Sequence, residues 1–312
     1  MLKKLNAVFL GTPDFSVPAL DILANHPYIN LKYVISMPDR PAGRGQNLKS
    51  PEVIDYAKNN KIKTFQTENI NKEDDFIQTL EKEKIDIIIV LAFAQFLGDK
   101  ILNLPSLGCF NIHTSLLPKY RGAAPIQYAI LNGDKTTGVS IQKMVKKMDA
   151  GDLVYENEVT IHPEETGGQL YTRLKFEAAL GLNTLIYNFV NNNIEYKAQD
   201  EANVSFAPTL KREQGHLQFA NEGYESIKNK VRALYPWPGT YCFLNKKRLK
   251  IFHIEKSTQK LKPGTIEIKD NQLLVGCLDA TIHLSDIQLE GKKRCLDSEL
   301  INGLQNKELT IS

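Results

Sequence analysis

The sequence predicts an α/β protein, in which a mostly parallel sheet flanked by helices is followed by a small all-β domain. Two observations lead to this fold class. Over the first 190 residues, apolar strand-like runs alternate with amphipathic stretches, the pattern of a parallel sheet whose strands are joined by helices. Beyond about residue 206, short β-type segments recur roughly every 8–12 positions between turn residues, a spacing typical of a small barrel or sandwich.

The length and composition agree with a folded protein of this kind. A chain of 312 residues has room for two domains of roughly 100–200 residues each. The hydrophobic share of 42% and the charged share of 24% are ordinary for globular proteins. The longest apolar run, Ile85–Phe93, is far shorter than the roughly 18 residues that cross a bilayer. No signal-peptide pattern opens the sequence, so we expect a cytoplasmic protein without a membrane partner. We also expect a monomer.

The individual elements of the first domain follow from their hydrophobic patterns. Apolar runs predict strands at Asn6–Leu10, Leu31–Ser36, Ile85–Leu91 and Gly108–His113. The run that begins at Ile85 is continuous enough for a strand that is buried on both faces of the sheet. Amphipathic stretches predict helices at Ser16–Ala24, Ser50–Asn60, Lys72–Glu83 and Ala124–Asn132. An antiparallel strand at Leu153–Ile161 and a long helix at Thr166–Asn192 complete this part.

The domain limits come from changes in the hydrophobic pattern along the chain. We expect a first domain at residues 1–190, a polar linker at 191–205 and a second domain at 206–312. The second domain should hold one helix, Ser226–Leu234, and strands at Gly239–Leu244, Leu249–Glu255, Gly264–Ile268, Gln272–Gly276 and Thr281–Gln288.

Charge and cysteine usage narrow the function classes. From residue 206 onward there are 17 Lys and Arg against 12 Asp and Glu, and this basic surplus suits a polyanionic partner. The four cysteines, Cys109, Cys242, Cys277 and Cys295, include no C-x-x-C pair, and the histidines are scattered. Neither a zinc site nor a disulfide framework is predicted, and we expect no metal.

Residues suited to catalysis lie at the end of the strand Gly108–His113 and in the segments that follow it. Asn111 and His113 are two apart, so they project to one face of that strand, near the end where open α/β sheets bind ligands. The loop Ser115–Pro125 is too rich in proline and glycine for a regular element. Asp149 precedes a turn that could have a purely structural role. An NAD site is disfavoured, because Gly11 opens no G-x-G-x-x-G fingerprint.

These residues also form recognisable motifs. Asn111-x-His113, followed by S-L-L-P-K-Y-R-G-A-A-P-I, resembles the 10-formyltetrahydrofolate-dependent formyltransferases, and M-D-A-G-D at 148–152 resembles their second motif. Phe9–Pro18, Pro38–Gly45 and Tyr235–Gly239 resemble the members that act on methionyl-tRNA. The resemblance covers nearly the whole chain. It departs at 214–219, where family members often carry an acidic residue and a tryptophan.

The resemblance implies a fold and a reaction. The first domain would be the Rossmann-like, mostly parallel sheet of the formyltransferase fold and would be catalytic. The second would be an OB-like barrel that binds tRNA. The enzyme would move a formyl group from 10-formyltetrahydrofolate to the α-amino group of methionyl initiator tRNA, by direct attack through a tetrahedral intermediate and without a metal.

The family match also assigns roles to residues. Asn111 would donate to the oxyanion, His113 would exchange a proton, and Asp149 would orient the imidazole. Residues 115–118, namely Ser115, Leu116, Leu117 and Pro118, would contact the folate. Arg40, Arg44 and Lys211 would contact tRNA. Lys119 and Arg121 would meet either the folate glutamate or an RNA phosphate.

Other functions remain compatible with the sequence. The acceptor could be a small amine, either an amino-sugar nucleotide or glycinamide ribonucleotide. The chain could instead be a folate-binding hydrolase that releases formate, or a non-catalytic RNA-binding protein. Asp149 could cap backbone N–H groups rather than contact His113.

Overall fold

The structure is a computed structural model that describes residues 4–43, 45–304 and 308–312. Contacts divide the chain into two compact units. The first unit holds Met1–Gly122, Thr137–Val159 and Tyr171–Phe206, and the second holds Ala123–Thr136, Thr160–Leu170 and Ala207–Ser312. The second unit therefore includes two short pieces from the middle of the chain. As functional divisions, the limits at 190 and 206 stay predictions.

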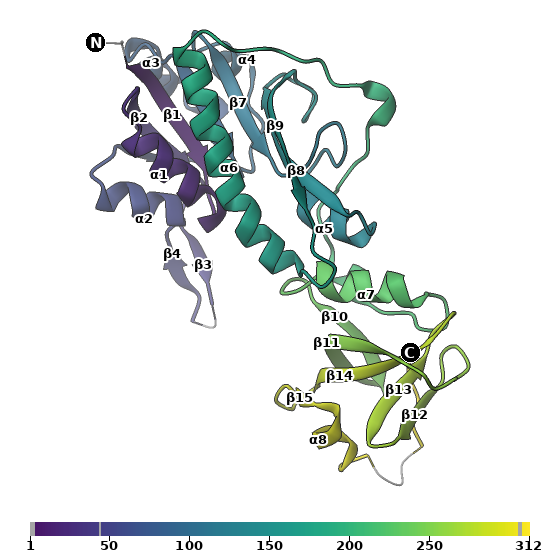
Figure 1. The fold of residues 1–312 in the computed structure, drawn as a ribbon. Helices are drawn as coiled ribbons and strands as arrows, with labels where there is room; N and C mark the ends of the chain where they lie inside the picture. Colours follow the sequence, from purple (N-terminus) through teal and green to yellow (C-terminus); the bar gives the residue numbers. More distant parts are fainter. Residues whose placement is uncertain (1–3, 44, 305–307) are drawn as a thin grey trace. The chain divides into compact units, whose positions relative to one another are not determined.

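The first unit is built on a seven-stranded sheet (Figure 1). Its spatial order is β5-β2-β1-β6-β7-β8-β9. The strands are β1 (Leu5–Gly11), β2 (Ile29–Ser36), β5 (Thr64–Gln66), β6 (Ile87–Leu91), β7 (Gly108–His113), β8 (Thr136–Lys143) and β9 (Leu153–Thr160). The pairs from β5 to β7 are parallel, and β8 runs antiparallel to β7. The expected mostly parallel sheet is confirmed.

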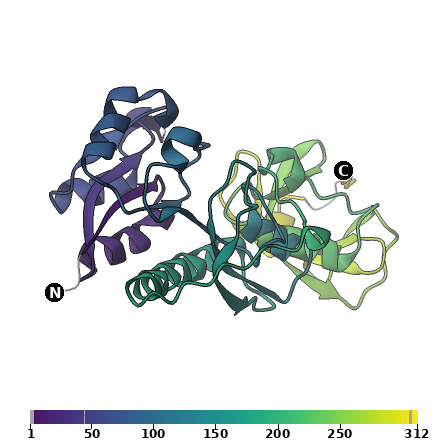
Figure 2. The same ribbon diagram turned by 90° about the horizontal axis from the view of Figure 1, so that it is seen from above.

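Helices cover both faces of this sheet, as the view in Figure 2 shows. They are α1 (Val17–Asn25), α2 (Glu52–Asn59), α3 (Asp74–Lys82), α4 (Asp99–Leu102) and α6 (Gly167–Val190). On one face, side chains of α3 and α4 join Val8 and Leu10 of β1 in a buried cluster. Helix α6 packs across the sheet, where the ring of Phe189 contacts that of Phe110 on β7 at a centroid distance of 5.1 Å.

Several parts of this unit differ from the expectation, which did not include β5, α4 or β8. β8 was not predicted, because Ser140 and Gln142 occupy buried positions of the strand and break its apolar run. In the segment at residues 38–45, which resembles a motif of the family, residues 40–42 form β3 (Arg40–Ala42), which pairs antiparallel with β4 (Asn47–Lys49). Short strands with few apolar residues leave little pattern to detect.

The second unit is an antiparallel, strand-rich domain. Its sheet has the order β10-β11-β14-β13-β12, with β15 paired to β14. The strands are β10 (Thr240–Leu244), β11 (Lys247–Ser257), β12 (Ile266–Lys269), β13 (Gln272–Gly276), β14 (Thr281–Leu289) and β15 (Cys295–Leu296). Inward-facing residues such as Leu249, Ile251 and Leu284 form its buried core.

The second unit also contains helices α5 (Pro125–Leu131), α7 (Tyr224–Ala233) and α8 (Asp297–Ile301). The expectation of a single helix after residue 206 is therefore wrong, because α8 follows β15. With only five residues, α8 is too short to show a helical period. None of the helices in the described ranges is both long and apolar enough to span a bilayer.

Candidate active site

Strand β7 holds the first two candidate residues on the same face. Asn111 and His113 lie two positions apart near its carboxyl end, where the strand is buried between β6 and β8. The register with β8 places Gln142 opposite Asn111 and Ser140 opposite His113. Side chains at directly opposed positions lie on the same face of a sheet. Four polar side chains therefore share this corner of an otherwise apolar sheet.

Asp149 reaches the same corner from the turn between β8 and β9. Its Oδ1 accepts hydrogen bonds from Asn111 Nδ2 at 3.3 Å and from Gln142 Nε2 at 3.0 Å. Its Oδ2 accepts one from the Gly122 N–H at 2.9 Å. The structure thus brings Asn111, His113 and Asp149 together, and the Asp149 carboxylate also accepts a hydrogen bond from a backbone N–H.

The imidazole of His113 is buried, with 6% of the residue exposed. Its Nε2 lies 2.8 Å from the carbonyl oxygen of Tyr120. A carbonyl can only accept, so Nε2 carries a hydrogen and Nδ1 is the nitrogen that gains or loses a proton. Asp149 Oδ2 faces Nδ1 at 3.8 Å, which is a charge contact rather than a hydrogen bond.

Ser140 holds the backbone of the predicted folate loop, residues 115–118, through two hydrogen bonds. The Ser140 hydroxyl donates to the carbonyl oxygen of Ser115 at 2.8 Å and accepts from the N–H of Leu117 at 3.0 Å. Those two backbone groups are used inside the protein. Leu116 and Pro118 are only half-buried, so their side chains supply the loop's accessible apolar surface.

The residues predicted to bind tRNA have different surroundings. Arg40 is exposed on β3 and pairs with Glu68 at 2.8 Å. Lys211 is an exposed residue of the second unit, just before a 3₁₀ turn. Arg44 lies outside the described residues.

Arg121 has mainly internal partners in the structure. We expected it to meet folate or phosphate, but it is only 1% exposed. Its Nη2 donates to Gln199 Oε1 at 2.7 Å and to Glu201 Oε1 at 2.8 Å. These internal partners engage Nε and Nη2, whereas Nη1 is buried without a hydrogen-bond partner among the described residues. Lys119, two residues earlier, is exposed.

Sequence reasoning missed Gln142 and Gln199. Ser140 and Gln142 repeat the i, i+2 polar spacing of Asn111 and His113, but this signal was hidden because the strand that carries them was not predicted. Gln199 lies in the polar stretch 191–205, which carries no period. Its amide nitrogen donates to the carbonyl oxygens of Asp149 and Gly151, at 2.9 and 2.8 Å.

Among the residues that the structure describes, no group of three or more His, Cys, Asp or Glu is arranged to hold a metal ion. The four cysteine thiols are free. Burial raises the pKa of Cys109 to about 12, since a thiolate is costly in an apolar environment.

Comparisons with known proteins show the family of this chain. The family model described as "Formyl transferase" matches residues 5–186, and that described as "Formyl transferase, C-terminal domain" matches residues 209–305. A methionyl-tRNA formyltransferase of Halothermothrix orenii is 38% identical, with 97% of this chain and 98% of the relative covered. One of Bacillus velezensis is 39% identical, with 95% and 94% covered.

Solved structures show the same fold. A sugar 3N-formyl transferase, crystallised with dTDP and 5-N-formyl-THF, superposes with a TM-score of 0.66 at 21% identity, covering 94% of this chain and all of that one. HypX from Aquifex aeolicus, in complex with tetrahydrofolic acid, gives a TM-score of 0.61 at 14% identity, covering 96% of this chain and 48% of HypX. With two family models and near full-length relatives in agreement, the chain belongs to the methionyl-tRNA formyltransferases of the formyl transferase family.

Proposed function

We propose that this protein transfers the formyl group of 10-formyltetrahydrofolate to the α-amino group of methionine carried by initiator tRNA. One observation carries the proposal. Asn111, His113 and Asp149 converge at the carboxyl end of β7, in a chain whose relatives of similar length are named methionyl-tRNA formyltransferases.

Asn111 is the proposed oxyanion donor. Attack by the amine on the formyl carbon leaves negative charge on the formyl oxygen, which needs a donor in place before the reaction begins. An amide nitrogen has two hydrogens. One of those on Asn111 is directed at Asp149, and the second can donate to substrate.

His113 and Asp149 are the proposed proton route. The attacking amine must lose a proton, and N10 of the folate must gain one as the C–N bond to the formyl group breaks. His113 can carry that proton, because Nδ1 is the free nitrogen of a ring whose Nε2 is held by Tyr120. The carboxylate of Asp149 faces Nδ1 and would stabilise positive charge there.

Residues 115–118 are the proposed contact with the folate. Ser115 and Leu117 anchor this loop through Ser140, while Leu116 and Pro118 are partly exposed apolar residues. An apolar surface beside a few fixed polar groups is the usual make-up of a site for a flat heterocycle.

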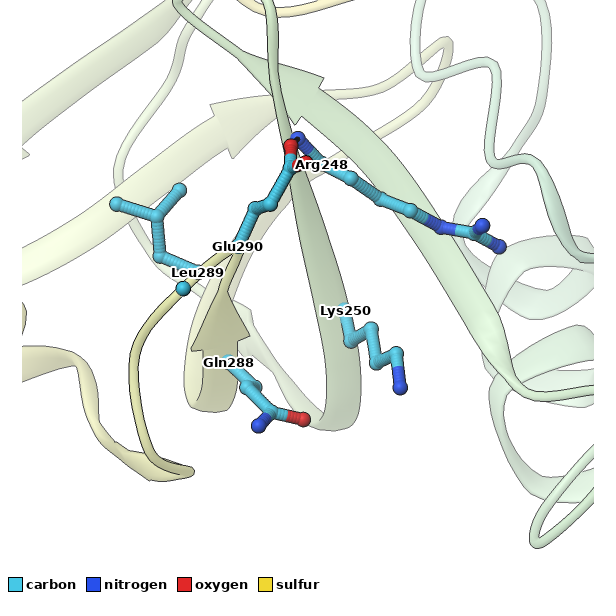
Figure 3. Close-up of a pocket in the computed structure, with 6 residues that line it drawn as sticks. Arg248, Lys250, Gln288, Leu289 and Glu290 are labelled. Carbon is cyan, nitrogen blue, oxygen red and sulfur yellow. Dashed lines mark hydrogen bonds between the residues drawn. The ribbon is translucent and has the colours of Figure 1, made fainter. Parts of the chain in front are cut away.

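The tRNA contacts are proposed at Arg40, Arg44, Lys211 and a surface of the second unit. On that unit, Arg248 and Lys250 of β11 and Gln288 of β14 line a hollow of about 250 Å³ (Figure 3). The guanidinium of Arg248 lies 3.7 Å from the centroid of the Tyr241 ring. We call Tyr241, Arg248, Lys250 and Gln288 the basic face. Cations beside aromatic rings on a sheet suit a nucleic-acid backbone, as in OB-like barrels.

A second candidate acceptor is a sugar amine, because solved structures of sugar formyltransferases share the fold. Single-turnover transfer of labelled formyl from the folate decides between the two. We expect label on charged initiator tRNA, and little on a dTDP-amino sugar, glycinamide ribonucleotide or uncharged tRNA. Preferred labelling of the sugar or ribonucleotide would overturn the proposal, and release of free formate would indicate a hydrolase. We further propose that the protein works as a monomer in the cytoplasm.

A further inference from the structure

Gln199 holds the main chain of the turn that carries Asp149. Its single amide nitrogen donates to the carbonyl oxygens of Asp149 and Gly151, at 2.9 and 2.8 Å. The turn needs such support, because Asp149 has a φ of +49°, a left-handed conformation that is costly for a residue with a side chain. Gln199 therefore stabilises the strained backbone of the residue that carries the carboxylate.

Arg121 fixes which way the Gln199 amide faces. Its Nε and Nη2 lie 3.1 and 2.7 Å from Gln199 Oε1. A guanidinium has only donors, so it must meet the amide oxygen. The NH₂ group is thereby directed at the turn. Glu201 accepts from the same Nη2 at 2.8 Å and balances the buried charge.

The neighbours of Arg121 contact both proposed catalytic groups. Tyr120 offers its carbonyl oxygen to His113 Nε2, and Gly122 gives its N–H to Asp149 Oδ2. The same stretch is secured by residue 205, whose carbonyl oxygen accepts the Arg121 N–H at 2.9 Å and whose hydroxyl accepts the Tyr120 N–H at 2.9 Å. The segment expected to be a linker therefore supports the catalytic corner twice, through Gln199 and through Ser205.

We propose that Gln199, oriented by Arg121, is a positioning residue that sets the distance between the Asp149 carboxylate and the His113 imidazole. This inference rests on the catalytic role of Asp149 in the proposed function. The carboxylate already lies 3.8 Å from Nδ1, so a small displacement of the turn would remove the contact. Misplacing a reacting group by about 1 Å can cost on the order of 10²-fold in rate.

Two substitutions separate this role from simple support of the fold. Gln199→Glu keeps an oxygen for Arg121 but removes the donors to the turn, whereas Gln199→Leu removes both. Each should lower kcat by about 10-fold to 10²-fold while the KM for the folate changes less than about twofold. Asn203→Ala is the control, since the Asn203 side chain in the same segment donates to Asp200; its kcat should match wild type. If Gln199→Leu does not fold, Gln199→Glu alone decides.

A double-mutant cycle with Asp149→Asn supplies the deciding measurement. If Gln199 acts through Asp149, Gln199→Glu should lower single-turnover rates by less than about twofold in the Asp149→Asn background. The pH–rate profile of Gln199→Glu should also shift in the same direction as that of Asp149→Asn. An equal loss in both backgrounds, or a wild-type rate for Gln199→Glu, would overturn the inference. If Asp149→Asn itself had a wild-type rate, the proposed function of Asp149 would fail instead, whatever Gln199 does.

Discussion

The proposed catalytic corner, made of Asn111, His113 and Asp149, and the basic face use polar groups in opposite ways. At the corner, Asn111 and His113 stand among buried residues, and their partners are within hydrogen-bonding or charge contact. On the basic face, Lys250 is exposed and Arg248 lies against the ring of Tyr241. The proposed role of the corner depends on the positions of its side chains, whereas the proposed role of the basic face depends on its positive charge. Changes at the corner should therefore alter rate, and changes on the face should alter affinity and its dependence on salt.

The largest effect is expected at the corner. Asn111→Ala and His113→Ala should each lower single-turnover transfer by at least about 10²-fold, because they act on charge and protons that appear only during the reaction. Folate binding, measured by fluorescence titration, should stay within about twofold. Ser106→Ala, on the loop before β7, is a control expected at wild-type rate. A variant that kept a tenth of the wild-type rate would not have the proposed role.

The next effect is expected on the basic face. Arg248→Ala should weaken tRNA binding and reduce the slope of log K against log salt by about 0.7–0.9 for one lost phosphate contact. The rate at saturating tRNA should not change. Lys269→Ala, on β12 at the other edge of the sheet, is the matched control. Equal slopes for Arg248→Ala and wild type would mean that the face is ordinary solvated surface.

Arg40 extends the comparison to the first unit, with a smaller effect. It is exposed and paired with Glu68, and an ion pair of this kind contributes little to stability. Arg40→Ala should raise the KM for charged tRNA by about 3-fold to 10-fold and leave the Tm and folate affinity unchanged. An equal loss of folate affinity would assign this hairpin to the other substrate.

The smallest effect concerns stability at low pH. Hydrogen bonds from Arg121 and Lys147 lower the pKa of Glu201 to about 2, from a usual 4.5. A lowered folded-state pKa stabilises the protein above about pH 4.5 and loses that contribution as the pH falls toward 2. The Tm of wild type should therefore exceed that of Glu201→Gln at about pH 7, and the gap should narrow below about pH 4.5. A gap that stays constant with pH would contradict the assignment. Glu68→Gln is the surface-pair control.

The sequence predicted what local patterns can encode. The spacing of Asn111 and His113 placed both on one face, and the motif at 148–152 suggested Asp149, which the structure brings beside them. Gln199 could not be predicted in this way, because its bonds to Asp149 and Gly151 span 50 and 48 positions. The burial of Arg121 could not be predicted for a related reason: a guanidinium in a loop is usually exposed, and its internal partners Gln199 and Glu201 lie far along the chain.

The turn at 148–152 also limits how this sequence can evolve. A Cβ atom on Gly151 would lie 1.7 Å from the carbonyl oxygen of Lys143, and because that oxygen belongs to the backbone, no rotamer change can relieve the clash. Met148, by contrast, is 46% exposed. Substitutions should therefore be tolerated at Met148 and excluded at Gly151, three residues later. Gly151 would stay invariant for a steric reason, although it has no side chain that could take part in the chemistry.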